Sequence, residues 1–432
     1  MSIFAAELKR VCQPVRMLVV LCVFLLVALF FLPRIAWDHE VQHAADASAA
    51  IARLYGTHLD AEERSRMEDE LFAQSKENIR LRMDACEAFV EAGVKTYEDY
   101  CFLRYDKTRL AVMTQEEKNA MSDEHFFLNY GVGKDYDATL SEAEITLLEL
   151  SDANAGEVGE ILYECLVFQR IEDWVTFWYD DRQRLASFTE YAENAYEAQA
   201  LQNYVQAENY YGNMPYEVSE SVSKCVGVVT VAALFSVMLL CSLSPAVDRV
   251  TKTDILQTVT KKGKKVLLQQ CKVSVFCAAV ISICAVAVSF GFLLMHIPSV
   301  LWNCPVNSYQ SFFTIYHFNG TLLQYFLLCV VLQVLLIFAC SLFAFASSLT
   351  AKNYTVLFGL LLPLLVVTEW LANLLLRIPF SAKQSLHGPL YFSDLIAFPM
   401  AEIPLCVLLF VAALFVSLLA VQKRKKELAD YL

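Results

Sequence analysis

The chain has 432 residues, of which 57% are hydrophobic and 19% charged, with a formal net charge of -13 at pH 7. This composition is too apolar for an ordinary soluble domain and too charged for a protein built of membrane helices alone, so both classes are excluded. The charges are segregated along the sequence. The expected fold class is all-α, a polytopic membrane protein with six transmembrane helices and a mostly helical extracytoplasmic domain.

Six apolar runs are long enough to cross a bilayer, which takes about 20 residues of helix. The first, at 17–33, lies between Arg16 and Arg34. We expect it to be an uncleaved span rather than a signal peptide, because no small-residue cleavage site follows it. Charges, prolines or polar clusters bound the other five, which lie at 225–243, 273–296, 322–348, 354–376 and 403–421.

The distribution of lysine and arginine predicts the orientation of these spans, because cytoplasmic loops retain positive charge more often than translocated ones. Basic residues precede the first span, fill the loop after the second, and follow the fourth and the sixth, whereas residues 298–320 contain none. We therefore expect a multi-pass protein of the plasma membrane with both termini in the cytoplasm. The predicted domains are 1–34 (an interfacial helix and the first span), 35–223 (extracytoplasmic) and 224–432 (five spans with a cytoplasmic loop at 245–272).

The extracytoplasmic domain carries most of the acidic residues and mainly helical signals. The stretch 59–90 reads as a charged amphipathic helix, and Thr114 to Glu117 and Ser141 to Glu144 fit the capping box. Apolar and aromatic residues at helical spacing over 158–211 predict one core-facing stripe, with an aromatic ligand cage as the alternative. Its acidic surface is interpreted as a solvated face, and binding of a cationic peptide remains open. Disulfides also remain open for four cysteines, namely Cys86, Cys101, Cys165 and Cys304.

The loop between the second and third spans is too long and too patterned for a minimal hairpin. Residues 254–259 can form a short helix capped by Thr253, which Gly263 then ends. The residues of interest are Asp248, Arg249, Thr251, Asp254, Ile255, Leu256, Thr258, Gly263 and Lys264.

These residues resemble the cytoplasmic loop of the ABC type 2 permease family, in which a charged pair, a short leucine-containing helix and a Gly-Arg or Gly-Lys turn precede the third span. Lys264 stands where the family often has Arg. The segment Phe4 to Arg10 is similar to the amphipathic helix before the first span of these permeases, and 54–64 resembles the opening of the ectodomain in Gram-positive members. The resemblance implies that the loop contacts an ATP-binding cassette subunit, which binds ATP and Mg²⁺. It also implies a second permease chain, in a homodimer or heterodimer, and an amphipathic substrate such as a lipid, peptide or drug.

The chain itself carries no pattern for nucleotide hydrolysis. The phosphate-binding sequence GxxxxGK[ST] is absent, as are a catalytic serine elbow and HExxH. We therefore expect no enzymatic activity, no cofactor and no metal on this chain, and membrane lipids rather than nucleic acid as its surroundings. The nucleotide would be bound by a separate subunit.

Three ionisable residues lie in or near the apolar runs and are candidates for an intramembrane polar site, because an unpaired charge in lipid costs several kcal/mol. They are Glu369, His296 and Glu402. Each is near enough to an interface to reach water, which is the competing explanation. Residues 377–399 can hold a re-entrant segment, and the sequence does not decide this.

Two simpler interpretations compete with a transporter. The basic loop alone can be held against anionic lipid, each lysine contributing on the order of 1 kcal/mol. The whole chain can be a non-transporting receptor or scaffold, whose ectodomain binds a peptide or envelope ligand.

Overall fold

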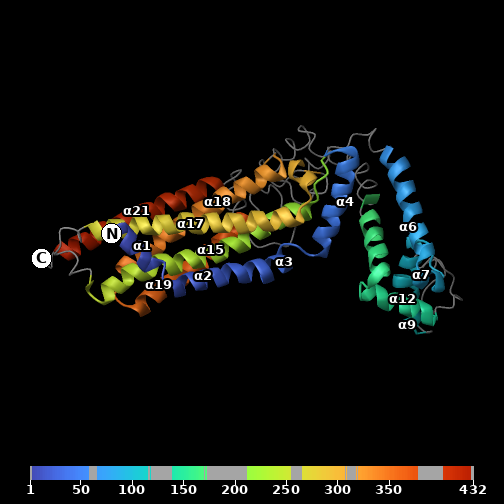
Figure 1. Ribbon diagram of the computed structural model, residues 1–432, viewed down its shortest axis with the longest axis horizontal. Coiled ribbons are helices and arrows are strands. Elements are labelled where there is room, and N and C mark those ends of the chain that lie inside the picture. Colours follow the sequence, from blue (N-terminus) through green and yellow to red (C-terminus); the bar gives the residue numbers. More distant parts are fainter. Residues whose placement is uncertain are drawn as a thin grey trace. The chain divides into compact units, whose positions relative to one another are not determined.

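The computed structural model describes residues 2–57, 66–114, 117, 139–169, 171–172, 212–253, 265–306, 308, 318, 320–377 and 402–429. These residues are almost entirely helical, and the one strand-like pairing among them is an isolated antiparallel bridge between Pro305 and Thr321. The predicted all-α class is confirmed for this part of the chain. The chain divides into two compact units, a helical bundle (Met1–His58 with Asp181–Leu432) and a smaller unit (Leu59–Asp180) (Figure 1).

Two polar-faced helices flank the first long apolar helix. Helix α1 (Ile3–Val11) begins after Ser2, whose side chain accepts a hydrogen bond from the Ala5 amide and caps the helix. Helix α4 (His39–Tyr55) is capped in the same way by Asp38, and it buries a face of alanines that allows close packing. The predicted helix at Phe4 to Arg10 is therefore confirmed as a helix.

The first membrane-length helix runs from Pro14 to Ile35. Proline suits its first turn because the missing amide hydrogen would have no helical partner there. A wide π-helical turn interrupts the regular hydrogen bonding in its second half. The three consecutive segments are α2 (Pro14–Leu26), η1 (Val27–Phe31) and α3 (Leu32–Ile35).

Helix α15 (Tyr216–Val250) is the central element of the bundle (Figure 1). Its most apolar stretch is 72% buried by the protein, against 22% for the helices Pro14–Ile35 and Ile403–Ala429, which expose most of their side chains. Most of the other helices of the bundle contact α15, whereas the C-terminal helix, Glu402–Ala429, packs against the helix Leu322–Thr350. At 35 residues it is longer than the predicted span at 225–243, and it continues through Pro245 to Val250. The prediction that a loop begins at residue 245 was wrong, because the helix runs on for six further residues.

Four further long helices complete the bundle, with a short 3-10 helix, η7 (Ser299–Asn303), between the first two. They are α17 (Val266–His296), α18 (Leu322–Thr350), α19 (Tyr354–Arg377) and α21 (Glu402–Ala429). Among the described residues, five helices are long and apolar enough to cross a membrane, while the apolar part of α19 is shorter. These five helices indicate a multi-pass membrane protein; the fifth of the six predicted spans, at 354–376, stays a prediction.

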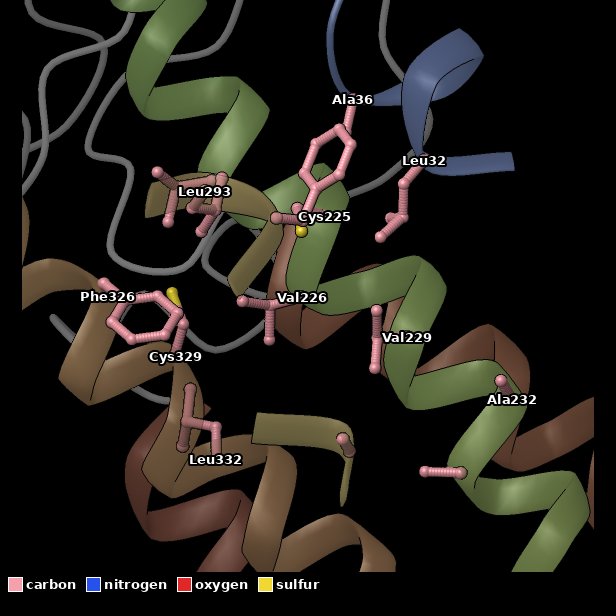
Figure 2. Packing of buried hydrophobic residues seen from close by; sticks show 14 of the residues in the cluster. Leu32, Ala36, Cys225, Val226, Val229, Ala232, Leu293, Phe326, Cys329 and Leu332 are labelled. Carbon is pink, nitrogen blue, oxygen red and sulfur yellow. The ribbon is translucent and has the colours of Figure 1, made fainter. Parts of the chain in front are cut away.

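Small and polar side chains join the central helices. Figure 2 shows Cys225 and Val226 of α15 beside Leu293 of α17 and Cys329 of α18. Because lipid is as apolar as the helix surfaces, such bundles are held by close packing and interhelical hydrogen bonds more than by hydrophobic burial. The side chains of Ser341 and Gln333, both on α18, supply two such bonds. Ser341 Oγ donates to the Ser274 carbonyl of α17 at 3.1 Å, and Gln333 Nε2 donates to Thr230 Oγ1 of α15 at 3.0 Å.

The smaller unit consists of short helices around a separate core. Their order is η2 (Met67–Phe72), α6 (Ala73–Ala85), α7 (Glu87–Glu91), α8 (Tyr97–Cys101), η3 (Phe102–Lys107), α9 (Thr108–Val112), α12 (Glu142–Asp152) and a helix over 156–169. The core gathers residues from most of them, including Met83, Phe89, Leu103, Leu147 and Ile161.

The structure tests several predictions for this unit. The capping boxes at Thr114 with Glu117 and at Ser141 with Glu144 are confirmed, since both reciprocal hydrogen bonds form in each. The predicted single helix over 59–90 was wrong, because extended backbone at Cys86 separates α6 from α7. The apolar stripe is confirmed over the helix at 156–169, and its continuation through 173–211 lies outside the described residues.

All 14 cysteines are free thiols. Cys86 and Cys165 are buried in the core of the smaller unit, Cys304 is buried in the bundle, and Cys101 is half-buried. The position of the two units relative to a membrane, and with it the extracytoplasmic domain at 35–223, stays a prediction.

Candidate functional site

A buried polar cluster joins the N-terminal helix to the end of α15. We call it the Asp248 cluster, and it consists of Glu7 and Arg10 of α1, Ser244 and Asp248 of α15, and Gln270 of α17. Helix α1 is placed against α17 by apolar contacts as well, since the Phe4 ring meets the Phe276 ring edge-on at 5.9 Å between centroids. Residues more than 230 positions apart in the sequence therefore meet in one cluster.

Asp248 lies at the centre of the cluster and is only 3% exposed. Arg10 Nη1 lies 2.6 Å from Asp248 Oδ1, and Gln270 Nε2 donates to Asp248 Oδ2 at 2.7 Å. Thr253 Oγ1 also donates to Oδ1 at 3.0 Å. A buried carboxylate needs such partners, because removing it from water costs several kcal/mol unless charge and hydrogen bonds compensate.

Glu7 brings a second carboxylate into the same buried site. Its Oε2 atom accepts longer hydrogen bonds from Ser244 Oγ at 3.3 Å and Gln270 Nε2 at 3.4 Å. Burial raises the pKa of Glu7 above its usual range, and the negative charge of Asp248 raises it further, although Arg10 and the two donors act in the opposite direction. Two carboxylates therefore share one guanidinium, and Glu7 is the one that takes up a proton more readily than it would in water.

Arg249, the next residue along α15, makes contacts on the other side of the helix. Its guanidinium donates a hydrogen bond to the Leu349 carbonyl near the end of α18, and its Nη2 lies 3.6 Å from Glu427 Oε2 of α21. Arg424 Nη1 binds the same Glu427 oxygen at 2.7 Å. The adjacent residues Asp248 and Arg249 thus connect the end of α15 to α1, α17, α18 and α21.

The structure places three of the predicted loop residues. Asp248 and Arg249 lie on α15 rather than in a loop, and Thr251 is its C-cap residue, with Oγ1 donating to the Val247 carbonyl at 2.7 Å. The chain then turns at Lys252, whose φ of 55° is left-handed. Six predicted loop residues lie outside the described residues, namely Asp254, Ile255, Leu256, Thr258, Gly263 and Lys264.

The three intramembrane candidates lie on three different helices, α17, α19 and α21. His296 ends α17, where Nδ1 hydrogen-bonds the Phe292 carbonyl at 2.8 Å and the ring packs 5.4 Å from the Trp37 ring. Glu369 is exposed on α19. Glu402 is the first residue of α21, and its side chain lies outside the described part. The interfacial explanation for these three residues stays a prediction.

Sequence reasoning missed the roles of Glu7, Arg10 and Gln270 in the cluster, and of Glu427 beside it. A signal existed for Glu7, an acidic residue on the buried side of an amphipathic helix whose other charged residues are the exposed Lys9 and the half-buried Arg10. The contacts of Gln270 and Glu427 depend on how distant helices pack, which local patterns do not specify.

Comparison of the chain with models of protein families, with curated protein sequences and with solved structures gives no match. The resemblance to ABC type 2 permeases therefore stays a hypothesis that rests on the sequence.

Proposed function

We propose that the chain is the membrane-spanning permease subunit of an ABC transporter, which moves an amphipathic substrate such as a lipid, peptide or drug. ATP, with Mg²⁺, is hydrolysed on a separate ATP-binding cassette subunit. Two permease chains, identical or different, complete the pathway. In this proposal α19 is the fifth of six spans of the plasma membrane. Both termini lie in the cytoplasm, and residues 35–223 lie outside the cell.

The observation that supports this proposal best is the connection of the loop to four helices. The predicted coupling segment follows the end of α15, where Asp248 and Arg249 bind α1, α17, α18 and α21 through their side chains. A subunit that moved this loop would therefore move the ends of five helices together rather than bend one hairpin. Packed helices with two discrete arrangements are the usual means by which such a displacement reaches a distant site.

The central position of α15 adds to the argument. A displacement at Val250 travels along a continuous helix, whose buried side chains pack against α17 and α18. Pro245 provides a place where the helix can bend, because it lacks the amide hydrogen of a regular turn. Binding of ATP between two partner subunits would then favour one arrangement of the bundle over another.

The test is co-purification with the ATP-binding subunit. A chain with Asp254, Ile255 and Leu256 all replaced by glycine should lose the bound ATPase, because the predicted loop helix would no longer form. The matched control replaces Lys261, Lys262 and Lys265, which lie outside the predicted contact residues, with glutamine; this should reduce binding to anionic vesicles but leave the ATPase bound. Retention of the ATPase by the glycine variant would contradict the proposal.

A receptor or scaffold remains the second candidate, because the smaller unit contains a ligand-sized pocket. It predicts a cytoplasmic partner without ATPase activity. The measurement that separates the two is ATP hydrolysis by the purified complex with a partner bound.

A further inference from the structure

A pocket of about 570 Å³ opens in the smaller unit between α6, the α8–η3 segment and the end of the helix over 156–169. Its size falls within the range of about 300–1,000 Å³ that small-molecule sites occupy. The alternative interpretation of residues 158–211 was an aromatic ligand cage. Of the aromatic residues in that stretch the pocket contains Phe168, and its other rings come from α8 and η3.

Aromatic side chains form the apolar wall of this pocket. Phe168 is 7% exposed and is packed edge-on against Phe72, with 5.7 Å between ring centroids. The hydroxyl of Tyr97 donates to Gln169 Oε1 at 2.9 Å, which fixes the orientation of its ring. Phe102 completes the wall. Lys76 Nζ already lies 5.7 Å from the centroid of Phe168, so this wall accepts a cation over a ring face.

Acidic side chains outnumber basic ones in the lining of the pocket. Lys76 Nζ lies 2.7 Å from Glu172 Oε1, and Arg80 binds Glu77 through two hydrogen bonds of 2.6 and 2.9 Å. Both cations of the lining are thus neutralised by carboxylates of the lining. The two other acidic side chains of the lining therefore determine its net charge.

These two are Glu98 at the start of α8 and Asp106 in η3. Neither side-chain carboxylate forms a hydrogen bond or an ion pair with another described residue. Both line the same pocket as Cys101, and each raises the pKa of the Cys101 thiol, after burial, which is the larger cause. With its pKa raised, the thiol stays neutral and is a poor nucleophile. The two carboxylates are thus the acidic groups of the lining that no cation of the lining neutralises.

We propose that this pocket binds an organic ammonium ion with an apolar body. The ammonium group lies at Glu98 and Asp106, and the apolar body lies against Tyr97, Phe102 and Phe168. The carboxylates supply attraction and charge-assisted hydrogen bonds, while the rings supply contact area and cation–π attraction. This site goes beyond the permease proposal, and it does not depend on coupling to an ATPase.

The experiment measures binding of tryptamine to the full-length chain in nanodiscs by isothermal titration calorimetry. Tryptophol, which carries a hydroxyl in place of the ammonium group, is the neutral probe of the same shape. We expect tryptamine to bind at least tenfold more tightly than tryptophol. Equal affinity for the two probes, or binding of neither, would overturn the proposal.

Variants locate the site. The double variant Glu98→Gln with Asp106→Asn should weaken tryptamine binding at least tenfold and leave tryptophol binding unchanged. The matched control is Glu87→Gln with Glu91→Gln, which removes two exposed charges from the same unit outside the pocket and should weaken binding less than twofold. Equal effects of the two double variants would show only general attraction to an acidic surface, and would contradict a specific site.

A further variant tests the aromatic wall. Phe102→Leu keeps an apolar side chain but removes a ring face, and it should weaken tryptamine binding about two- to fivefold, the scale of one cation–π contact. Affinity equal to that of the unmodified chain would exclude Phe102 from the site and overturn the proposed wall.

Discussion

Asp248 and Arg10 form an ion pair whose two members differ in access to water. The Asp248 side chain is 4% exposed and that of Arg10 is 30% exposed. Removing either partner leaves the other without its opposite charge, but only the arginine can recover by turning towards solvent. The two single substitutions are therefore not equivalent, although they break the same contact.

We expect Arg10→Gln to destabilise the protein by about 3 kcal/mol, because it leaves a buried carboxylate uncompensated. Asp248→Asn should cost only about 1–2 kcal/mol, since the amide keeps a hydrogen bond with Gln270 and Arg10 becomes hydrated. Thermal unfolding in detergent micelles measures both. Lys9→Gln, which changes an exposed charge on the same helix, is the control and should stay within about 0.5 kcal/mol. A smaller effect of Arg10→Gln than of Asp248→Asn would contradict this account.

The ionisation of Glu7 makes the free energy of unfolding depend on pH, and the direction of the pKa shift fixes the sign of this dependence. Its pKa is higher in the folded protein than the ordinary value of 4.5, so the folded state binds more protons than the unfolded state between these two pKa values. Stability from this group is therefore present at low pH and lost as the pH rises from about 4.5 through the folded pKa.

Glu7→Gln should remove this dependence. Midpoints of thermal unfolding measured from pH 4.5 to pH 8 should fall less steeply in the variant than in the unmodified protein, and near pH 7 the variant should be the more stable of the two. Parallel profiles for the two proteins would show that Glu7 ionises in the bundle as it does in water.

Among the elements, α18 carries a polar side chain whose bonding is incomplete. Gln333 is fully buried, and its amide nitrogen binds Thr230, but its Oε1 atom has no hydrogen-bond partner among the described residues. Thr230 also donates to the Val226 carbonyl within α15 at 2.6 Å, so it does not depend on Gln333.

Gln333→Leu should therefore be neutral or stabilising, because it removes both a bond of about 0.6 kcal/mol and an unsatisfied carbonyl. Thr230→Val should destabilise by about 1–2 kcal/mol, since it leaves the glutamine amide nitrogen without its closest acceptor. Unfolding by sodium dodecyl sulfate compares the two. The reverse order would mean that Gln333 contributes more than the structure accounts for.

The end of α21 is tied to α15 through Arg249 and Glu427. Arg249→Gln should expose the basic residues 423–426 to trypsin about fivefold faster, which corresponds to about 1 kcal/mol less resistance to local opening. Limited proteolysis followed by mass spectrometry measures the rate. Lys224→Gln, which breaks an ion pair near the other end of α15, is the control and should leave cleavage at 423–426 unchanged.

At the scale of the whole molecule, sidedness is the central expectation. Alkaline phosphatase, which is active only outside the cytoplasm, should be active when fused after Val112, and green fluorescent protein should fluoresce when fused after Ala429. The opposite result at Val112 would invert the orientation predicted from lysine and arginine and would place the Asp248 cluster away from any cytoplasmic ATPase.

The long helices could be predicted because apolar runs and their charged borders are local properties. The starts at Leu322 and Tyr354 and the end at His296 agree with the sequence prediction. The extension of α15 to Val250 could not be predicted, because Pro245 and the polar residues after it are typical of a loop, and only packing against α1 and α17 makes a helix favourable there. Asp248 and Arg249 were recognised as candidates, but their partners on four other helices depend on contacts distant in sequence.

The meeting of α1 with Gln270 also sets an order of assembly. Gln270 follows Glu7 by 263 residues, and at roughly 5–20 residues per second the ribosome needs about 13–53 seconds to make that stretch. Until Ser244 is made, 237 residues after Glu7, the carboxylate of Glu7 has neither of its later hydrogen-bond donors, so α1 stays in contact with water or lipid head groups. In a nascent chain that stalls before α17 is made, α1 is therefore not fully packed. Quality-control proteases could distinguish such a chain from a finished one by this exposed helix.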